Sequence, residues 1–290
     1  MKLLVFGQTG QVARELARAL TRDGDGRAPE AVFLGRETAD LMQPESCGAA
    51  IRLHRPDAVI NTAAWTAVDR AETEEAAATT VNGAAPGAMA QAAADLGLPF
   101  LHVSTDYVFS GEGTRGWSET DRPAPLNAYG RSKLAGETAV LAAGGNPLIL
   151  RTSWVFSAHG TNFVKTMLRL SESRSTLNVV EDQIGGPTPA SALAATLLML
   201  AGALRAGAAG GVYHYAGAPE TSWAGFAREI FARAGRAVTV TGIPSSAYPA
   251  PARRPLNSRL DGAGLQRDFG IMPADWRADL SRVIGELSHG

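Results

Sequence analysis

Short apolar runs alternate with stretches of helical periodicity along much of the chain. The apolar runs comprise residues 2–6, 31–34, 56–61, 100–105 and 147–151. Runs of this length that end at glycine or polar residues predict strands. Between them, stretches such as residues 12–20 carry apolar positions at helical spacing and predict helices. The pattern therefore indicates a chain in which strands alternate with helices.

Two longer alanine-rich segments are also expected to be helical. In residues 71–96 we expect an interruption near Asn82 and Gly83, with Pro86 in the first turn of the resumed helix. The uncharged run of residues 185–204 invites a membrane-spanning interpretation. Two prolines break its start, however, and leave about 22 Å of helix over residues 190–204, short of the roughly 30 Å hydrocarbon core. We expect a buried packing helix there.

The overall composition argues against several classes of protein. The 290 residues carry a formal net charge of −1, and 19% of them are charged. Such a chain lacks the electrostatic signature of a protein that binds nucleic acid or an anionic membrane. Cys47 is the one cysteine, which excludes an intrachain disulfide, and the apolar stretch after Lys2 is too short for a signal-peptide core. We expect a cytoplasmic protein.

The first predicted strand leads directly into a glycine-containing turn and a helix. Gly7 permits the tight turn, and Gly10 lets the backbone approach a phosphate closely. Ala13 holds the third glycine position and is small enough for the helix to pack on the strand. Because the start of a helix binds phosphate through its backbone N–H groups, this spacing predicts a site for the pyrophosphate of a dinucleotide.

The end of the second predicted strand bears on the choice between NADPH and NADH. An acidic residue there would hold the 2′-hydroxyl of NAD, whereas an arginine suits the 2′-phosphate of NADP. Arg36 favours NADPH, but the neighbouring Glu37 keeps NADH as an alternative, and a solvated arginine on a turn would give the same pattern. Asp40 and Leu41 follow and are expected to frame the adenine, with Leu41 as its apolar wall.

The tips of the third and fourth predicted strands supply further candidates. Small residues after the third strand, among them Ala63 and Ala64, would let a flat cofactor lie against the backbone. Trp65 in the same segment either lines a pocket or packs in the core. A hydroxyl at the tip of the fourth strand is placed to bind a substrate carbonyl. Thr105 is our candidate, with Ser104 as the alternative because successive side chains point to opposite faces.

Tyr129 and Lys133 lie four residues apart and would share one face of a helix. An ammonium beside a phenol favours the phenolate, so the pair can donate and accept a proton near neutral pH. The spacing alone is also typical of a surface helix, but together with the dinucleotide site it predicts a nicotinamide-dependent reductase. The loop of residues 110–126 precedes this helix and is expected to cover the site. His102, with no adjacent ligands for a metal, is expected to be structural.

Segments along nearly the whole chain resemble the extended short-chain dehydrogenase/reductases and, within them, the dTDP-4-dehydrorhamnose reductases. The glycine turn and the Tyr129–Lys133 pair are typical of the superfamily at large. More specific to the subgroup are Ser-Thr-Asp-Tyr-Val-Phe at residues 104–109, Arg-Thr-Ser-Trp-Val at 151–155 and Ala-Arg-Arg-Pro at 252–255. Other matching segments are residues 66–69, 126–130, 162–168, 182–183, 186–188 and 257–260.

The resemblance implies a doubly wound, mostly parallel Rossmann sheet with a smaller C-terminal lobe. The NAD(P)-binding domain would comprise residues 1–155 with 188–218, and the sugar-nucleotide lobe residues 156–187 with 219–290. With NADPH or NADH, the enzyme would reduce the 4-keto group of dTDP-4-dehydro-β-L-rhamnose to give dTDP-L-rhamnose. This is the last step of dTDP-rhamnose biosynthesis, which serves cell-surface polysaccharides.

The resemblance also implies roles for individual residues. Tyr129 would give a proton to the sugar ketone, Lys133 would tune the phenol and hold the nicotinamide ribose, and Thr105 would orient the ketone. Asp106 would contact the sugar, and Trp154 would stack on it. The positions expected to contact the cofactor are Gly7, Gly10, Gln11, Val12, Arg36, Asp40, Leu41, Ala63, Ala64, Trp65, Thr66, Val103, Tyr129 and Lys133.

Further positions concern the diphosphate of the substrate and a metal. Arg253 and Arg254 carry guanidinium groups that match phosphate geometry, although a solvated basic turn is the alternative, and we expect Arg254 to bind. Some members of the family hold Mg²⁺ at a dimer interface through two glutamates. Glu15 matches the first, but Ser191 stands where the second is expected, and a hydroxyl is a poor ligand for this cation. We therefore expect no metal, and the homodimer is an open expectation.

Two other functions stay open. An epimerase or dehydratase of the same superfamily keeps the tyrosine and lysine but regenerates its cofactor. A dehydratase would also place a second carboxylate where Tyr107 follows Asp106. A regulatory subunit resembling the β subunit of methionine adenosyltransferase would share the fold without catalysis, although the intact set of Thr105, Tyr129 and Lys133 argues against it.

Overall fold

A six-stranded parallel sheet forms the centre of the molecule, in a computed structural model that describes residues 1–22 and 29–288. The strand order is β10-β5-β4-β3-β1-β2, and every neighbouring pair is parallel. The order reverses beside β1, and in open α/β sheets this is where ligands bind, at the carboxyl ends of the strands. The bounds are β1 Lys2–Phe6, β2 Glu30–Leu34, β3 Ala58–Asn61, β4 Phe100–Thr105, β5 Pro147–Thr152 and β10 Gly211–His214.

The predicted strands are present, with one shortened. The third begins at Ala58 rather than at Pro56, because proline lacks the N–H that a central strand needs for its ladder. The neighbouring Asp57 instead accepts a hydrogen bond from the backbone N–H of Lys2 through its carboxylate (2.7 Å).

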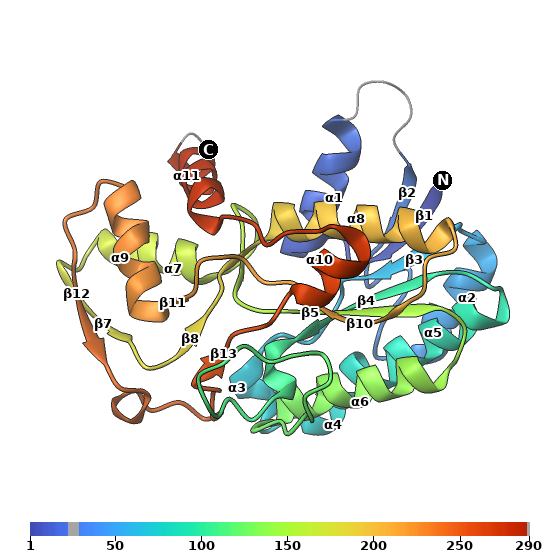
Figure 1. The fold of residues 1–290 in the computed structure, drawn as a ribbon, viewed down its shortest axis with the longest axis horizontal. Helices are drawn as coiled ribbons and strands as arrows, with labels where there is room; N and C mark the ends of the chain where they lie inside the picture. The colour runs from blue at the N-terminus through green and yellow to red at the C-terminus, as the bar shows by residue number, and fades with distance from the viewer. Residues whose placement is uncertain (23–28, 289–290) are drawn as a thin grey trace.

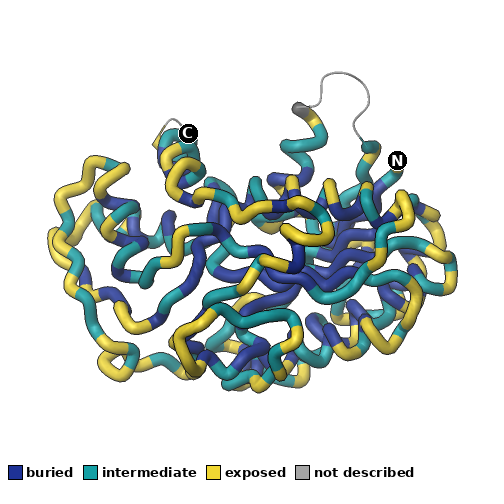
Figure 2. The backbone as a smooth tube through the Cα atoms, in the orientation of Figure 1, coloured by how far each residue is buried: buried dark blue, intermediate teal, exposed yellow. Residues whose placement is uncertain are grey.

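Helices cover both faces of the sheet (Figure 1). Successive side chains of β1 enter opposite cores, Leu3 and Val5 on one face and Leu4 and Phe6 on the other. Figure 2 shows the strands as the most continuously buried part of the backbone. The expected doubly wound, mostly parallel fold is confirmed. The helices are α1 Gln11–Arg22, α8 Ala190–Arg205 and α10 Ala263–Phe269 on the first face, and α2 Pro44–His54, α5 Ala85–Asp95 and α6 Ala128–Ala142 on the second.

The uncharged run near residue 190 forms α8 and packs on the sheet, as predicted. Leu193, Leu197 and Leu200 are fully buried in the core that α8 shares with α1 and β1. In the part of the chain that the structure describes, no helix has the length and apolarity needed to cross a membrane.

The predicted interruption of the helix near Asn82 is a π-helical turn, Thr80–Ala84. It lies between α4 Glu75–Thr79 and α5, and the first part of the predicted helix is the separate short helix α3 Val68–Ala71. The side chain of Asn82 accepts a hydrogen bond from the Trp65 backbone N–H and donates to the Trp65 carbonyl and the Ser132 hydroxyl. Because a Cβ at Gly136 would collide with the Asn82 carbonyl, glycine lets α6 pack directly on this turn.

A third core lies to one side of the sheet, at the left in Figure 1. It includes Phe156, Phe226 and Trp276. By contrast α10, which falls in the chain segment expected to form the smaller lobe, packs on the central sheet through Leu265 and Phe269. The elements around the third core are β6 Val155–Phe156, α7 Phe163–Ser171, β7 Thr176–Val180, β8 Ile184–Gly185, β9 Thr188–Pro189, β11 Thr221–Ser222, α9 Trp223–Arg233, β12 Thr239–Ile243, β13 Asn257–Ser258 and α11 Trp276–Ser288.

Candidate active site

The turn between β1 and α1 has the geometry of a phosphate cradle. Gly7 has a φ of 111°, and a Cβ there would lie 2.7 Å from the Thr62 hydroxyl, so glycine is required. Gly10 is exposed, and a Cβ added to it would meet nothing within 4 Å. This open space lies directly before the N-terminus of α1, which begins at Gln11. The residues present therefore fit the pyrophosphate of a dinucleotide.

Two of the residues expected to contact the cofactor, Gln11 and Val12, make other contacts through their side chains. The Gln11 carboxamide oxygen accepts hydrogen bonds from Ser157 and Asn162, each at 2.9 Å, and its nitrogen donates to the Val155 carbonyl. Val12 packs against the core that α1 and α8 form on the first face of the sheet. Contact with a cofactor would therefore involve the backbone of these residues.

The turn after β2 presents Arg36 to solvent. A Cβ at the preceding Gly35 would meet the side-chain oxygens of Gln8 and Glu37, so these polar groups border the same turn. The Asp40 carboxylate accepts a hydrogen bond from the Met42 backbone N–H at 3.0 Å.

Three of the apolar residues expected to contact the cofactor line the next part of the edge. Leu41 and Ala63 are half-buried against the core that α2, α5 and α6 form on the second face of the sheet. Trp65 and Tyr129 both pack against the small cluster of Ala71, Ala78 and Ala128, so the segment after β3 and the predicted catalytic tyrosine share one apolar cluster. In the same segment Ala64 is half-buried and Thr66 is exposed.

Tyr129 lies in the first turn of α6, whose start is fixed by two local features. The Asn127 side chain caps the helix by accepting a hydrogen bond from the Gly130 backbone N–H at 2.8 Å. A Cβ at Gly130 would collide with the Tyr107 carbonyl, so glycine allows the helix to approach the end of β4. The rings of Tyr129 and Tyr107 meet edge to face at 5.4 Å.

The phenol of Tyr129 differs from the sequence-based expectation in its acidity. Burial raises the pKa of Tyr129 to about 12, opposed by the Thr105 hydroxyl and reinforced by the charge of Asp106. The lysine expected to favour the phenolate is turned towards other partners, as described below. The group is therefore a phenol at neutral pH, the form that can donate a proton.

Thr105 and Asp106 meet at the tip of β4, both buried. The Thr105 hydroxyl donates to the Asp106 carboxylate at 3.1 Å and accepts from the Tyr107 backbone N–H at 3.2 Å. The hydroxyl of Ser104, the alternative candidate, is buried without a hydrogen-bond partner, as is Oδ2 of Asp106. Burial raises the pKa of Asp106 to about 6, and Ser258 is among the groups that oppose this shift.

Lys133 is almost completely buried between α6 and β4. Its Nζ donates a hydrogen bond to the Val103 carbonyl at 2.7 Å. Its Nζ also lies 3.2 Å from Nε2 of His102. The prediction that His102 is a hydrogen-bonded structural histidine agrees with its partners, but its contact with Lys133 was not foreseen. Burial lowers the pKa of Lys133 to about 8, with the charge of Glu137 acting in the opposite direction.

Trp154 has an unusual backbone conformation and a stacked side chain. Its φ of 51° places a bulky residue in the left-handed region, which is uncommon outside functional or strained sites. Its indole lies 3.7 Å from that of Trp223, centroid to centroid, with 15° between the ring planes. A Cβ at Gly185 would lie 3.0 Å from the indole, so this glycine also borders Trp154. A sugar would have to share the aromatic surface that these contacts leave.

Arg254 forms an ion pair with Asp69, which lies in α3. Its Nη2 donates to the Asp69 carboxylate at 2.8 Å, and the same carboxylate accepts the Ala252 backbone N–H at 3.2 Å. The preceding Arg253 is exposed, and its carbonyl accepts a hydrogen bond from Asn127, the residue that caps α6. The Ala-Arg-Arg-Pro segment therefore lies beside the N-terminus of the tyrosine-bearing helix.

The residues present do not fit a metal at Ser191. Its hydroxyl is bonded to Asp279 at 3.1 Å and accepts a hydrogen bond from the guanidinium of Arg282 at 2.7 Å. Arg282 also pairs with Asp279 and Glu286, so a protein cation already occupies this carboxylate cluster. Among residues 1–22 and 29–288, no group of three or more His, Cys, Asp or Glu side chains is arranged to hold a metal ion.

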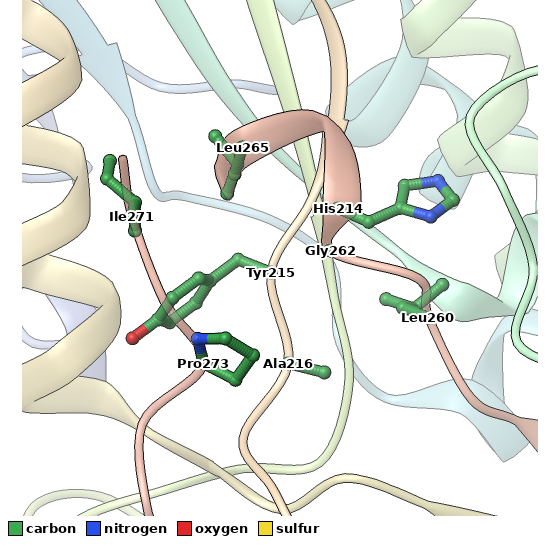
Figure 3. A pocket seen from close by; sticks show the side chains of 8 residues that line it. All are labelled: His214, Tyr215, Ala216, Leu260, Gly262, Leu265, Ile271 and Pro273. Carbon is green, nitrogen blue, oxygen red and sulfur yellow. The ribbon is translucent and has the colours of Figure 1, made fainter. Parts of the chain in front are cut away.

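Sequence reasoning missed several residues that the structure brings to the site. Tyr107, Trp223 and Ser258 contact Tyr129, Trp154 and Asp106 respectively. For Tyr107 the adjacency to Asp106 was a usable signal, but Trp223 and Ser258 are distant in sequence from their partners. The small cavity of about 20 Å³ drawn in Figure 3 contains none of the predicted site residues.

Comparisons of the sequence and the fold with known proteins identify the family of this chain. The family model described as the RmlD substrate binding domain matches residues 1–289. A dTDP-4-dehydrorhamnose reductase of Burkholderia thailandensis is 47% identical over 301 aligned residues, covering 99% of each chain. The crystal structure of a dTDP-4-dehydrorhamnose reductase from Clostridium acetobutylicum has a TM-score of 0.92 at 34% identity, covering 99% of this chain and 100% of that one. A dTDP-4-dehydrorhamnose reductase from Bacillus anthracis, in complex with NADP, has a TM-score of 0.91 at 32% identity, covering 98% and 99% of the two chains. The chain therefore belongs to the RmlD family, that of the dTDP-4-dehydrorhamnose reductases.

Proposed function

We propose that this chain reduces the 4-keto group of dTDP-4-dehydro-β-L-rhamnose to give dTDP-L-rhamnose, with NADPH as the reductant. The observation that carries this proposal is a full-length family match in a chain whose Thr105, Asp106 and Tyr129 converge at the tip of β4 and whose turn between β1 and α1 fits a pyrophosphate. A bound NADPH supplies a hydride to the carbonyl carbon.

The side chains of the site would complete the reduction. Tyr129, held as a phenol by its raised pKa, donates its proton to the carbonyl oxygen as negative charge develops there. Thr105 and Asp106 bind the sugar and orient the ketone towards Tyr129. Lys133 and Val103 would contact the nicotinamide ribose, which is supported by the hydrogen bond that joins them near the carboxyl end of β4.

We propose that residues 1–155 with 188–218 bind the cofactor and that residues 156–187 with 219–290 close on the sugar nucleotide. Arg254, anchored by Asp69, would pair with the diphosphate, and Trp154 would offer the apolar surface for the deoxysugar. The cofactor side would comprise Gly7, Gly10, Gln11, Val12, Arg36, Asp40, Leu41, Ala63, Ala64, Trp65 and Thr66.

The surroundings of Cys47 and Arg282 bear on location and assembly. The lone, buried Cys47 suits a reducing compartment, and we infer a cytoplasmic enzyme. If the chain forms a homodimer, the pairing of Arg282 with Asp279 and Glu286 would replace a bridging metal. Sedimentation with and without a chelator would then give the same mass.

The test is an assay of the purified protein with NADPH and candidate keto-sugar nucleotides. NADPH should be consumed with dTDP-4-dehydro-β-L-rhamnose, and dTDP-L-rhamnose should be the product by NMR. A UDP-linked keto sugar serves as the matched control for the nucleotide. An enzyme that converts dTDP-sugars without net consumption of NADPH would instead be an epimerase or dehydratase, and inactivity with every keto sugar would favour a regulatory role.

A further inference from the structure

An exposed tyrosine lies on the same segment of the chain as Arg254. Residues 244–256, which we call the strap, join β12 to β13 and carry both Tyr248 and Arg254. In Figure 1 the strap is the orange-red segment at the lower left of the molecule. Tyr248 is 56% exposed, whereas the other tyrosines of the chain are buried or half-buried. Its ring is therefore available to a ligand.

The N-terminal end of the strap is fixed by Asp182 and Gln183. The Asp182 carboxylate accepts hydrogen bonds from the Ser245 backbone N–H, at 2.9 Å to each oxygen, and from the Ser245 hydroxyl at 2.6 Å. The Gln183 amide nitrogen donates to the same hydroxyl at 2.9 Å, and its oxygen accepts from the Trp223 indole at 3.2 Å. Because Gln183 directly precedes β8 and Trp223 begins α9, these bonds tie the strap to both elements.

A second anchor holds the C-terminal part of the strap. The Asp69 carboxylate accepts hydrogen bonds from the Ala252 backbone N–H at 3.2 Å and from the Arg254 guanidinium at 2.8 Å. Nη1 of Arg254 also donates to the Ala252 carbonyl at 3.2 Å. The guanidinium therefore folds back towards the N-terminal part of the strap, where Tyr248 lies.

Between the two anchors the strap has little conformational freedom. Prolines occupy positions 244, 249, 251 and 255, and each fixes its own φ and restricts the residue before it. The backbone N–H of Tyr248 donates to the Ser245 carbonyl at 3.0 Å. The ring of Tyr248 is thus presented by a segment that is already ordered, so a ligand that binds there loses little affinity to ordering of the backbone.

A series of neighbouring groups leads from the predicted catalytic tyrosine to Tyr248. The ring of Tyr107 meets that of Tyr129 edge to face at 5.4 Å. Burial lowers the pKa of Arg254, but nearby groups, the phenols of Tyr107 and Tyr248 among them, raise it above its usual value. Both phenols therefore lie near the guanidinium. The series runs from Tyr129 through Tyr107 and Arg254 to Tyr248.

The proposed substrate carries its chemical groups in a matching order. Its keto sugar is followed by the diphosphate, the deoxyribose and the thymine base. With the ketone at Tyr129 and the diphosphate at Arg254, the base falls on the Tyr248 side of the arginine. An aromatic side chain suits this place, because every nucleobase has a flat face on which a ring can stack. We propose that Tyr248 stacks on the nucleobase of the sugar nucleotide, an inference that rests on the proposed function.

The first experiment measures binding by calorimetry with the full chain and with NADPH in excess, so that the cofactor occupies its own phosphate site. Tyr248→Ala should weaken the binding of dTDP at least about fivefold, the lower end of what stacking on an aromatic side chain contributes. Tyr248→Phe keeps the ring and should keep most of the affinity. Inorganic pyrophosphate, which has no base, should bind to the wild type and to Tyr248→Ala equally well.

Met272→Ala is the matched control for loss of an exposed apolar side chain. Met272 is 58% exposed, almost the same as Tyr248, and lies outside the strap. Its variant should bind dTDP as the wild type does. The melting temperature of Tyr248→Ala should also equal that of the wild type, because an exposed ring contributes little to folding. An equal loss of affinity for dTDP and pyrophosphate would contradict stacking on the base.

The second experiment separates binding from chemistry with the keto-sugar nucleotide as substrate. A contact with the base is made equally in the ground state and in the transition state. Tyr248→Ala should therefore raise the KM for the sugar nucleotide at least about fivefold and leave kcat unchanged. A lower kcat with an unchanged KM would refute a role confined to binding.

The outcomes distinguish this inference from the proposed function. A wild-type protein that does not bind dTDP would overturn both of them. A wild-type protein that binds dTDP, with the same affinity in Tyr248→Ala, would overturn the stacking of Tyr248 alone and leave the proposed reduction in place.

Discussion

At the scale of single residues, the chemistry depends on a phenol that keeps its proton. Tyr129→Phe removes the proton donor but preserves the ring that packs against Tyr107 and the alanine cluster of Ala71, Ala78 and Ala128. Turnover should fall at least about 100-fold, in line with contributions of general acids, while thermal stability stays close to that of the wild type. The measurement is kcat for NADPH oxidation with the keto sugar, beside a melting curve. A variant that keeps a third of the activity would rule out this role.

The choice of cofactor also depends on one side chain. Arg36 is exposed on the turn after β2, where a guanidinium could pair with the 2′-phosphate of NADPH. Arg36→Ala should raise the KM for NADPH at least about tenfold and change the KM for NADH little, because NADH lacks that phosphate. Equal effects on both cofactors would make Arg36 a solvated residue of the turn. Arg52→Ala, on the surface of α2, is the control.

At the scale of elements, the contact between α6 and the end of β4 decides where Tyr129 lies. Gly130 is the point of closest approach, and a methyl group there would collide with the Tyr107 carbonyl. Gly130→Ala should lower both the melting temperature and kcat, because α6 must shift away from Thr105. Gly202→Ala in α8 is the matched control, since its Cβ would meet nothing within 4 Å, and it should stabilise slightly, by about 0.5–1 kcal/mol. Full activity in Gly130→Ala would show that α6 tolerates the displacement.

The stacked indoles of Trp154 and Trp223 join the end of β5 to α9. Aromatic pairs of this kind contribute about 0.5–1.5 kcal/mol beyond their buried area, so Trp154→Ala and Trp223→Ala should both lower stability. Only Trp154→Ala should also raise the KM for the sugar nucleotide by about tenfold or more, if its indole faces the substrate. Equal KM values in the two variants would mean that Trp154 serves packing alone.

At the scale of the whole molecule, burial of Asp106 makes stability depend on pH. Its pKa is raised to about 6 in the folded protein, against a value near 3.8 when exposed, so the folded state binds the proton more tightly. This group's contribution to the unfolding free energy is therefore greatest below about pH 4 and is lost as pH rises through 6. The loss amounts to roughly 3 kcal/mol for a shift of this size.

Asp106→Asn tests this dependence, because the amide has no charge to bury. The variant and the wild type should differ least in denaturant midpoint near pH 4, and the variant should become relatively more stable towards pH 8. Asp268→Asn, at an exposed ion pair on α10, is the comparison that should show no such trend. A constant difference between Asp106→Asn and wild type across this range would contradict the raised pKa.

Much of the fold and part of the site followed from local pattern. The strands, the glycine turn and the Tyr129–Lys133 helix were predicted correctly because apolar periodicity and short spacings act over a few residues. Two features were not predicted: the start of β3 at Ala58 and the division of the long helix into α3, α4 and α5. They depend on the hydrogen bonds between strands and on the packing of α6 against Asn82.

The sequence by itself determined the strands of the central sheet, their alternation with helices, and which residue types could hold a cofactor or move a proton. Only the tertiary structure decided how those residues are partnered: Lys133 with His102, Trp154 with Trp223, Arg254 with Asp69, and Ser191 with Arg282. The reason is physical. A residue's place on a helix or strand follows from its neighbours along the chain, but its partner and its pKa depend on which distant segment the core packs against it. Desolvation and hydrogen-bond direction, which govern Tyr129, Asp106 and Lys133, exist only once that packing is complete.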